Sequence, residues 1–533
     1  MLLKDKTLII LSALLSILSC ERDENIFERQ GPEISPFIEV DVFKQEVGFP
    51  VSISIELRAI NGLGQLEVSK DGSPFDLVQY EKDQLIASYD LDYEVENVPD
   101  GSIITFSFEL TDQNGLEATP FSFDVEVGPP FSIEEAEVFG PTVQVITGRI
   151  NRNITLASEN DYLIDGLVSV EGNSNLTIEA GTTIFMRSFT DQQVSSLAIT
   201  QGSKLIAPGT KDAPIVFTSD RTLIDAATGE DWGGIYLYGK SSTNQGATVF
   251  QEGFIYGGAV DNDNSGSLRY VRIEHAGKQG IDALNFLGVG SATQLSFIQI
   301  FKCGDNGIRF KGGTADIKNI VVTDHAAYGL WAEHGWRGRG QFWVFQTSIA
   351  ATIIPVNFKN QARSVELRND RNNFLLSPAT YTQLSNITMI GNGSTDADGT
   401  RRGIRVRRGA MGVIHNIIAT NFPDDAVRVE DVAQDKLEDG TMVLGNARSF
   451  TNKTNYEEQA EIYFLPRSEF NLSEEPVPGI TPDNYVGSAP SSFNPNSLDS
   501  WFVSAPYIGA IMNAASDWTA DGTWCKNADG TIR

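Results

Sequence analysis

Acidic and histidine side chains gather in three short segments between residues 274 and 325. Carboxylates that project from adjacent strands can act as the acid and base of glycoside hydrolysis, and carboxylates clustered near a basic residue suit a calcium-dependent polysaccharide lyase. The spacing predicts that these segments face outward at the same place in a repeat and stack as a ladder. The alternative, which we favour, is that these side chains bond to the backbone in turns. The candidates are Glu274, His275, Asp305, Asp324 and His325, followed by Glu333 and His334.

Arginine is concentrated in one short segment of an acidic chain. The chain carries 40 Lys+Arg against 70 Asp+Glu, a formal net charge of −30. Guanidinium groups bind anions through paired N–H donors, and flat aromatic faces bind sugar rings. The segment predicts binding of a polyanionic glycan or an acidic partner surface, with simple solvation of the arginines as the alternative. The residues are Arg401, Arg402, Arg405, Arg407 and Arg408, with Trp331 and Trp336 as aromatic candidates.

Oxygen-bearing side chains at alternate positions form a weak calcium signal. Asp261, Asp263 and Ser265 precede Gly266, as in the first half of a calcium-binding loop. The twelfth position is Arg272 rather than an acidic residue, so the segment is not an EF-hand. A tight turn around these side chains is the alternative, and no other cofactor is expected.

The N-terminus has the pattern of an export signal. Lys4 and Lys6 precede an apolar run at residues 7–19, which is too short to span a bilayer comfortably. The run ends in Ile-Leu-Ser followed by Cys20, which resembles a bacterial lipobox. The resemblance implies cleavage before Cys20, a diacylglycerol on its sulfur and a palmitate-type acyl chain on the new N-terminus. Several acyl chains anchor a protein stably, so the predicted partner of this end is a membrane.

An acidic cluster at residues 21–24 follows this cysteine directly. It resembles the surface-export signal of Bacteroidota lipoproteins, which implies an outer-membrane location facing the cell exterior. A strongly acidic chain also repels phosphate backbones, so nucleic acid is not an expected partner. In such an oxidising compartment Cys303 and Cys525 are candidates for a disulfide, with simple burial of Cys303 as the alternative.

Apolar residues alternate with polar residues through most of residues 36–128. Period-two runs separated by Asn-Gly and Asp-Gly turns predict short antiparallel strands. We therefore expect an immunoglobulin-like β-sandwich there, after a signal peptide at 1–19 and an acidic tether at 20–35. The segment 129–145, which begins with two prolines, is expected to be a linker.

The main body, 146–431, shows an internal repeat. Segments that start at Leu268, Leu295 and Ile317 align, and each has an apolar residue thirteen positions after its start. Coils of this length with Val/Ile strands and Gly/Asn turns predict a parallel β-helix, in which each coil buries its apolar face against its neighbours. Residues 432–533 are expected to form an extended C-terminal segment and a cap.

Several of these segments together resemble the β-helix surface lipoproteins of Bacteroidota. The segments are residues 176–184, 202–210, 213–219, 231–235, 263–273, 508–510 and 517–519. The resemblance implies an all-β protein, with an Ig-like sandwich followed by a right-handed parallel β-helix of the pectin-lyase-like type. Members of that family mostly carry no assigned activity.

The predicted function is therefore non-catalytic. The protein is expected to be a glycan-binding module or an accessory subunit that joins an outer-membrane barrel or a second lipoprotein. The alternative is a cell-surface polysaccharide lyase or glycoside hydrolase. Two carboxylates that converge in a groove would favour this alternative.

Overall fold

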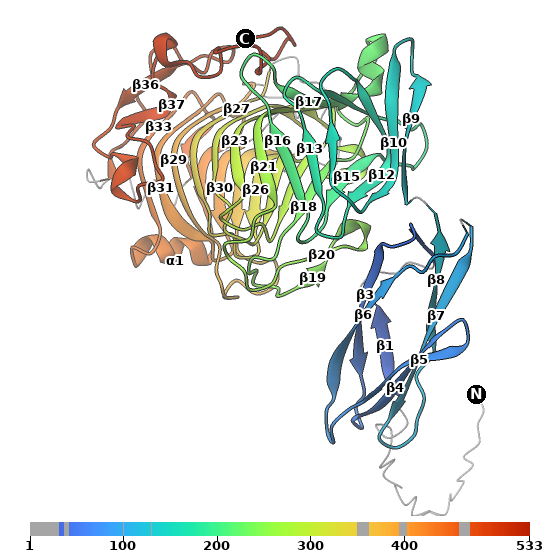
Figure 1. The fold of residues 1–533 in the computed structure, drawn as a ribbon. Coiled ribbons are helices and arrows are strands. Elements are labelled where there is room, and N and C mark those ends of the chain that lie inside the picture. Colours follow the sequence, from blue (N-terminus) through green and yellow to red (C-terminus); the bar gives the residue numbers. More distant parts are fainter. Residues whose placement is uncertain are drawn as a thin grey trace, which may run out of the picture. The chain divides into compact units, whose positions relative to one another are not determined.

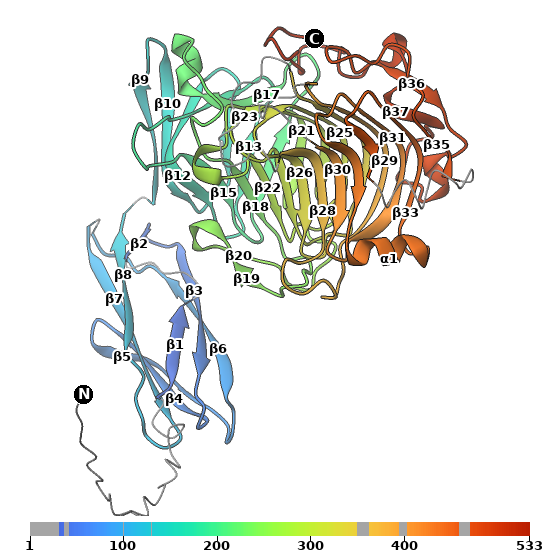
Figure 2. The ribbon, with the colours of Figure 1, turned by 180° about the vertical axis from the view of Figure 1, so that it is seen from behind.

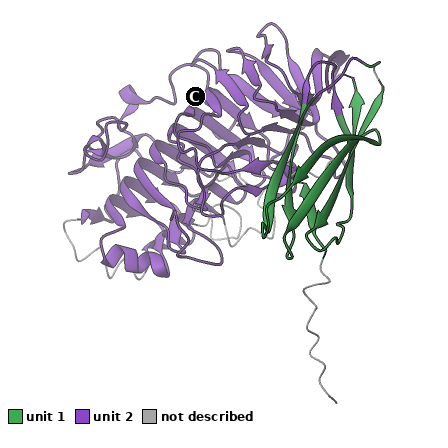
Figure 3. Cartoon of the chain, turned by 60° about the horizontal axis from the view of Figure 1, so that its bottom comes forward, with its two compact units in different colours: residues 1–43, 51–93, 98–127 green, residues 44–50, 94–97, 128–533 purple. Residues whose placement is uncertain are grey.

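The computed structural model describes residues 31–36, 42–99, 101–128, 130–348, 362–393, 402–457 and 470–533. The chain forms two compact units (Figure 3). One consists of residues 1–43, 51–93 and 98–127, and the other of residues 44–50, 94–97 and 128–533. None of the helices in the described ranges is long and apolar enough to cross a membrane.

The first unit contains two β-sheets. Along β3 (Pro50–Arg58) and β7 (Ile103–Asp112), buried residues alternate with more exposed ones, because successive side chains of a strand point to opposite faces. The buried rings of Phe106 and Phe123 stack with 5.5 Å between their centroids. One sheet has the order β1 (Glu33–Pro36), β3 (Pro50–Arg58), β6 (Ile86–Glu94), and the other β2 (Val42–Gln45), β8 (Phe121–Val127), β7 (Ile103–Asp112), β4 (Leu63–Lys70), β5 (Ser73–Gln79).

The second unit is a parallel β-helix, as the sequence predicted. It begins with β9 (Phe131–Glu137), which pairs antiparallel with β10, so the expected linker at 129–145 contains strands. Three parallel sheets then run along the coils. Sheet 1 contains β10 (Thr142–Ile150), β12 (Tyr162–Val170), β15 (Ser196–Ile199), β18 (Ile235–Tyr238), β22 (Leu284–Leu287), β24 (Ile308–Lys311), β26 (Tyr328–Glu333), β28 (Arg363–Arg368), β30 (Arg402–Arg407), β32 (Asp425–Val429) and β34 (Thr454–Tyr456).

Sheets 2 and 3 share the long strands of the later coils. Sheet 3 starts with β11 (Ile154–Leu156), β13 (Asn175–Ile178) and β16 (Lys204–Pro208), and continues through the first halves of the long strands. Sheet 2 contains β12, β14 (Thr183–Met186) and β17 (Ile215–Ser219), then the second halves of β21 (Gly266–Glu274), β23 (Gln294–Cys303), β25 (Ile317–His325), β27 (Arg339–Gln346), β29 (Tyr381–Ile390), β31 (Met411–Thr420) and β33 (Val443–Phe450), and ends with β35 (Leu472–Ser473).

Between its first and second halves, each long strand turns a corner at a residue with positive φ. Such a conformation is uncommon outside glycine, and asparagine adopts it most readily. At the first two of these corners the rings of Tyr270 and Phe297 stack with 4.4 Å between centroids. The corner residues are Tyr270, Phe297, Asn319, Phe342, Asn386, Asn416 and Asn446, with φ between 50° and 62°.

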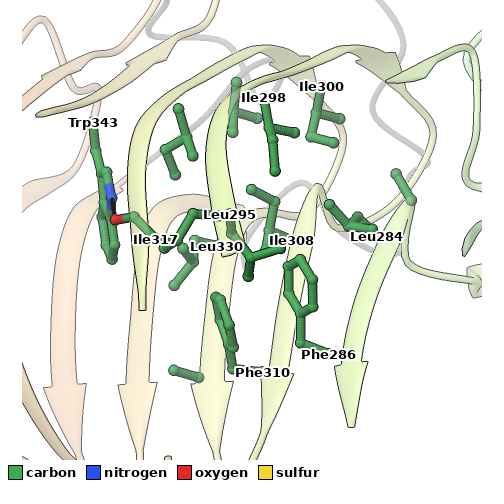
Figure 4. Close-up of a cluster of buried hydrophobic side chains, with 14 of the residues drawn as sticks. Leu284, Phe286, Leu295, Ile298, Ile300, Ile308, Phe310, Ile317, Leu330 and Trp343 are labelled. Carbon is green, nitrogen blue, oxygen red and sulfur yellow. Dashed lines mark hydrogen bonds between the residues drawn. The ribbon is translucent and has the colours of Figure 1, made fainter. Parts of the chain in front are cut away.

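The core fills the inside of the coils. Apolar side chains from one coil stack on those of the next, as Figure 4 shows for Leu284, Phe286, Ile308 and Phe310. The rings of Phe286 and Phe310 lie 4.8 Å apart, centroid to centroid. Because every coil contributes to one continuous core, the β-helix is stabilised mainly by contacts between neighbouring coils.

C-terminal residues cover the outer face of sheet 2. The hairpin β36 (Gly487–Pro490) and β37 (Tyr507–Ile511) lies against β29, β31 and β33 (Figures 1 and 2). Buried side chains of this cover, such as Ile508 and Trp524, pack on Val321, Val344 and Ile418 of sheet 2. Parallel strand pairing continues past the expected boundary at residue 431. After the short helix α1 (Val432–Glu438), β33 pairs with β31 and then with β35.

Candidate functional site

A pocket of about 540 Å³ lies on the outer face of sheet 1. Its volume is in the range of small-molecule binding sites. Arginines from three strands of sheet 1, β24, β28 and β30, and from the turns that follow β28 and β30 dominate the lining. We call it the arginine pocket, after Arg309, Arg363, Arg368, Arg371, Arg402, Arg405, Arg407 and Arg408.

Strand alternation and coil register bring these arginines together. In β24 the side chains of Ile308 and Phe310 enter the core, so Arg309 between them points outward. Figure 2 shows strands β26, β28 and β30 of this sheet side by side. Neighbouring strands lie about 4.8 Å apart, so in-register side chains on adjacent coils are within contact distance. One outward row runs Arg309, Trp331, Glu366, Arg405 and Arg428, and β28 and β30 also pair Arg363 with Arg402 and Arg368 with Arg407.

Two buried glutamates hold four of the arginines in place. The Glu366 carboxylate is fully buried and lies 2.6 Å from Arg363 and 2.5 Å from Arg407. The Glu333 carboxylate lies 2.5 Å from both Arg309 and Arg368. Burial alone would raise the pKa of Glu333, but Arg309 and Arg368 outweigh it and hold that pKa well below its usual range. The glutamates therefore form an anionic floor that orients guanidinium groups toward the pocket.

Two further arginines are paired at the edge of the pocket. Arg402 lies 2.8 Å from Asp424 and 3.5 Å from Asp425, and Arg405 forms an ion pair with Glu430. These contacts leave Arg371 and Arg408 as lining arginines that form no ion pair with any carboxylate of the described residues.

Arg408 is held in place through its backbone. It adopts φ 56° directly after β30, and its backbone N–H donates to the Asp431 carboxylate at 2.6 Å. Its Nη1 is buried and makes no hydrogen bond within the described part of the chain. Burial lowers its pKa, and Arg407 and Arg368 lower it further because like charges repel. Unbalanced positive charge at this point favours an anionic ligand.

Trp331 lies in the pocket, but it does not offer an open face to sugars. The guanidinium carbons of Arg309 and Arg368 lie 3.6 and 4.0 Å from the centre of its ring, so it holds two cations. Its indole Nε1 is buried and has no hydrogen-bond partner in the described ranges. The expectation for Trp336 was wrong: it is fully buried in the core, where it stacks on Phe310 at 4.3 Å.

Asp305 is the one predicted carboxylate that lines the arginine pocket. It is 4% exposed, and its Oδ1 has no hydrogen-bond partner among the described residues. Burial and the nearby Asp282 carboxylate raise its pKa to about 7 despite Arg309. A carboxyl group with such a pKa can hold or release a proton near neutral pH.

The other four candidates between residues 274 and 325 are buried and are not open to a ligand. Glu274 is 2% exposed and is satisfied by Arg272 at 2.6 Å, Lys526 at 2.7 Å and Thr218 at 2.9 Å. His275 is also buried, with its Nδ1 3.0 Å from the carbonyl oxygen of Thr228, and burial lowers its pKa. Glu274 and His275 therefore stabilise the turn and the C-terminal cover.

Asp324 and His325 likewise serve the fold. The Asp324 carboxylate accepts from the backbone N–H of Ser348 at 2.7 Å and from its hydroxyl at 3.1 Å, and burial raises its pKa. Burial lowers the pKa of His325 to about 4. The register aligns His275 with Lys302 and Asp324, all at positive φ, so the predicted ladder does not include Asp305.

The other two outward candidates form part of the ion-pair network. Glu333 belongs to the pocket floor, and His334 Nε2 lies 3.8 Å from both Glu333 and Asp370. Burial lowers the pKa of His334 to about 4.

The calcium candidates are engaged by hydrogen bonds. Asp261 accepts from the hydroxyls of Ser241 at 2.9 Å and Ser242 at 2.6 Å and forms an ion pair with Arg337 at 3.0 Å. Asp263 accepts weakly from Ser265 at 3.3 Å. Within the described ranges, no group of three or more His, Cys, Asp or Glu side chains is placed to hold a metal ion.

The candidate disulfide between Cys303 and Cys525 is not formed, in agreement with the alternative that Cys303 is simply buried. Cys303 and Cys525 are free, buried thiols. Cys303 belongs to the core inside the coils, whereas Cys525 packs in the cover outside sheet 2, so a strand of sheet 2 separates them. Two predicted site residues, Cys20 and Arg401, lie outside the described residues.

Half of the pocket arginines were not predicted as site residues from the sequence. Arg309, Arg363, Arg368 and Arg371 precede the arginine-rich segment, which starts at Arg401, by 30 to 92 residues. The available signal was their place in the repeat: Arg309 occupies the same position in its coil as Arg405, as the row through Trp331 and Glu366 shows.

A family model identifies the β-helix domain of this chain. No curated protein matches the chain. The crystal structure of the catalytic unit of a thermostable GH87 α-1,3-glucanase from Streptomyces thermodiastaticus strain HF3-3 matches with 10% identity and a TM-score of 0.29, over 78% of this chain and 85% of that one. Residues 148–475 match the family model of the pectate-lyase-like β-helix domain. The chain therefore belongs to the family of proteins with a pectate-lyase-like β-helix domain.

Proposed function

We propose that the protein is a non-catalytic surface lipoprotein that binds an anionic saccharide in the arginine pocket. The observation that carries this proposal is the lining itself: eight arginines surround one pocket, and two of them, Arg371 and Arg408, have no carboxylate partner in the described structure. Such unbalanced cations favour an anion that brings its own acceptor oxygens.

Preorganisation supports binding at this site. Glu333 and Glu366 are buried beneath the arginines and fix them before any ligand arrives. Ordering flexible side chains is a main cost of association, and it is reduced when they are already held. The rest of the chain is acidic, with a net charge of −30, so anion binding would depend on this local site rather than on the average field.

Replacement of the two unpaired arginines would test saccharide binding. Replacing Arg371 and Arg408 together with Gln should weaken retention by acidic polysaccharides in affinity electrophoresis by about tenfold or more, since each charge-assisted contact contributes about 1.5–3 kcal/mol. The matched control is Arg428→Gln, because Arg428 lies on the same sheet but is paired with Asp425 and Glu430. Equal retention of the double variant and the wild type would refute the role of the pocket.

The proposed location rests on Cys20. Acylation there would attach the protein to the outer membrane, with residues 36–128 as an Ig-like spacer that holds the β-helix away from the lipid. Cys20→Ala should then move the protein to the soluble fraction, and an added protease should cleave the wild type on intact cells. A pull-down of the tagged protein from solubilised membranes tests the accessory-subunit role. Recovery of an outer-membrane barrel or a second lipoprotein in equal amount would favour that role instead.

Asp305 gives a specific reason to keep an enzymatic alternative. A carboxyl group with a pKa of about 7 inside a saccharide pocket could donate a proton to a leaving oxygen in a glycoside hydrolase, or in a lyase. This alternative predicts release of reducing ends, or of unsaturated products, from an acidic polysaccharide, and loss of that activity in Asp305→Asn. Unchanged polysaccharide after prolonged incubation with the wild type would exclude it for the substrates tested.

A further inference from the structure

We infer that one corner of the arginine pocket holds a tetrahedral oxyanion, a sulfate or phosphate ester carried by the saccharide. The corner is formed by Arg368, Arg371, Arg407 and Arg408, and we call it the anion corner. The inference rests on the proposed saccharide binding and names the chemical class of the ligand.

The fold brings four guanidinium groups to this corner from separate segments. Arg368 and Arg407 are register partners on β28 and β30. Arg408 is the next residue along the chain, and its left-handed backbone turns it out of the strand. Arg371 lies in a turn whose shape is fixed by Asp370, which accepts from the backbone N–H groups of residues 372 and 373 at 2.8 and 2.7 Å.

The buried glutamates accept hydrogen bonds from only some of the N–H groups of these arginines. Arg368 donates its Nε to Glu333 at 2.7 Å, and Arg407 donates its Nε to Glu366 at 2.5 Å. No hydrogen bond joins the side chains of Arg371 or Arg408 to the described residues, and Arg408 Nη1 is buried. The corner therefore presents N–H donors from several directions to one anion.

The number and arrangement of these donors favour three acceptor oxygens over two. A carboxylate has two oxygens in one plane and is matched by a single bidentate arginine. A sulfate or phosphate ester presents three strong acceptor oxygens that point in different directions. Four arginines on β28, β30 and the turns that follow them match the second geometry better than the first.

Asp305 lies across the same pocket and suits the sugar part of such a ligand. Its buried Oδ1 has no partner among the described residues, so a sugar hydroxyl could donate to it. A ligand with an ester oxyanion and free hydroxyls would then satisfy both ends of the pocket. Trp331 takes no part as a stacking platform, because two guanidinium groups already occupy its ring.

Calorimetry on the wild-type protein tests the inference directly. Oligosaccharides of one backbone would be compared in four forms, carrying sulfate esters, phosphate esters, uronic acid carboxylates or no charge. We expect a sulfated or phosphorylated form to bind at least tenfold tighter than the uronate form. Equal or tighter binding of the uronate form would overturn the oxyanion inference but leave the proposed function intact, whereas no binding of any charged form would overturn both.

The pH dependence distinguishes the two esters. A phosphate monoester gains its second negative charge near pH 6, whereas a sulfate ester keeps a single charge. Affinity that rises between pH 5 and pH 7.5 for the phosphorylated form beyond that of the sulfated form would identify phosphate as the preferred group. Parallel curves with tighter sulfate binding would identify sulfate, and both results support the inference.

A variant series connects the preference with the anion corner. Arg408→Gln should reduce affinity for the sulfated or phosphorylated form about tenfold and affinity for the uronate form much less. Arg428→Gln, outside the pocket lining, should change neither, and circular dichroism would confirm that both variants fold. Equal losses for all charged ligands in Arg408→Gln would show that the residue supplies charge alone and would overturn the inference.

Discussion

Arg407 and Glu366 form an ion pair of 2.5 Å between adjacent coils of the β-helix, and the Glu366 side chain is fully buried. Glu366 also pairs with Arg363 on its own strand at 2.6 Å. One carboxylate therefore fixes arginines from two coils beneath the pocket, so fold stability and the proposed ligand binding depend on the same side chain.

Removal of the Glu366 charge should destabilise the protein strongly. Glu366→Gln leaves Arg363 and Arg407 without their counter-ion, and loss of one partner of a buried pair costs about 3–5 kcal/mol. The free energy of unfolding from urea titration measures this loss. The control is Glu56→Gln, which removes a solvent-exposed pair with Arg58 and should cost far less. A loss as small as in the control would contradict the role of Glu366.

The pKa of Asp305 predicts a particular pH dependence of stability. Its pKa is about 7 in the folded protein and about 3.9 when unfolded, so the folded state binds more protons between these values. The free energy of unfolding therefore falls as pH rises through this range, by about 1.4 kcal/mol per pH unit at most. Asp305→Asn removes this pH dependence. As the pH rises from 4 to 7, the variant should therefore become progressively more stable relative to the wild type. Urea titrations at pH 5 and pH 8 check this, and a constant difference between the two proteins would disprove it.

The repeat was readable from the sequence because the core enforces it. The predicted alignment of Leu268, Leu295 and Ile317 is the register that the strands adopt, since each of these side chains stacks inside the coils. Inward positions tolerate only apolar residues, so the pattern persists along the chain.

The pocket was less predictable because outward positions carry no such constraint. Trp331 and Trp336 are five residues apart, yet one lines the pocket and the other enters the core, because the chain turns between them at Gly335 with φ 85°. The long segment between β27 and β28 also breaks the repeat length, so the coil that holds Arg363 and Arg368 could not be aligned with the coil of Arg309 before the strands were known. Charge partners such as Glu366 come from another coil, which spacing alone does not reveal.

The two described cysteines should behave as buried thiols. Burial raises the pKa of Cys525 to about 12 and raises that of Cys303 further, so neither forms a reactive thiolate near neutral pH. We expect the melting temperature to be the same with and without reductant, and both thiols to react with a thiol reagent only after unfolding. Peptide mapping that finds a bond between Cys303 and Cys525 would contradict the separation of the two clusters.

The C-terminal cover should detach when its central tryptophan is removed. Trp524 is fully buried outside sheet 2, where its ring contacts Tyr270 and Phe297 edge-on, with centroids 5.8 and 5.9 Å apart. Trp→Ala at such a site costs about 3–5 kcal/mol, and the cover is the element whose packing is lost. In Trp524→Ala, peptides from residues 507–533 should therefore exchange amide hydrogens faster, while β22, β24 and β26 keep their protection.

The matched control for this prediction is Trp501→Ala in the same C-terminal segment. Trp501 is only partly buried and contacts the cations of Lys318 and Arg339 rather than the apolar cluster around Trp524. Its removal should leave exchange in residues 507–533 close to that of the wild type. Equal protection in Trp524→Ala and the wild type would show that polar contacts, such as the 2.9 Å hydrogen bond from Arg272 to the Trp524 carbonyl, hold the cover without the ring.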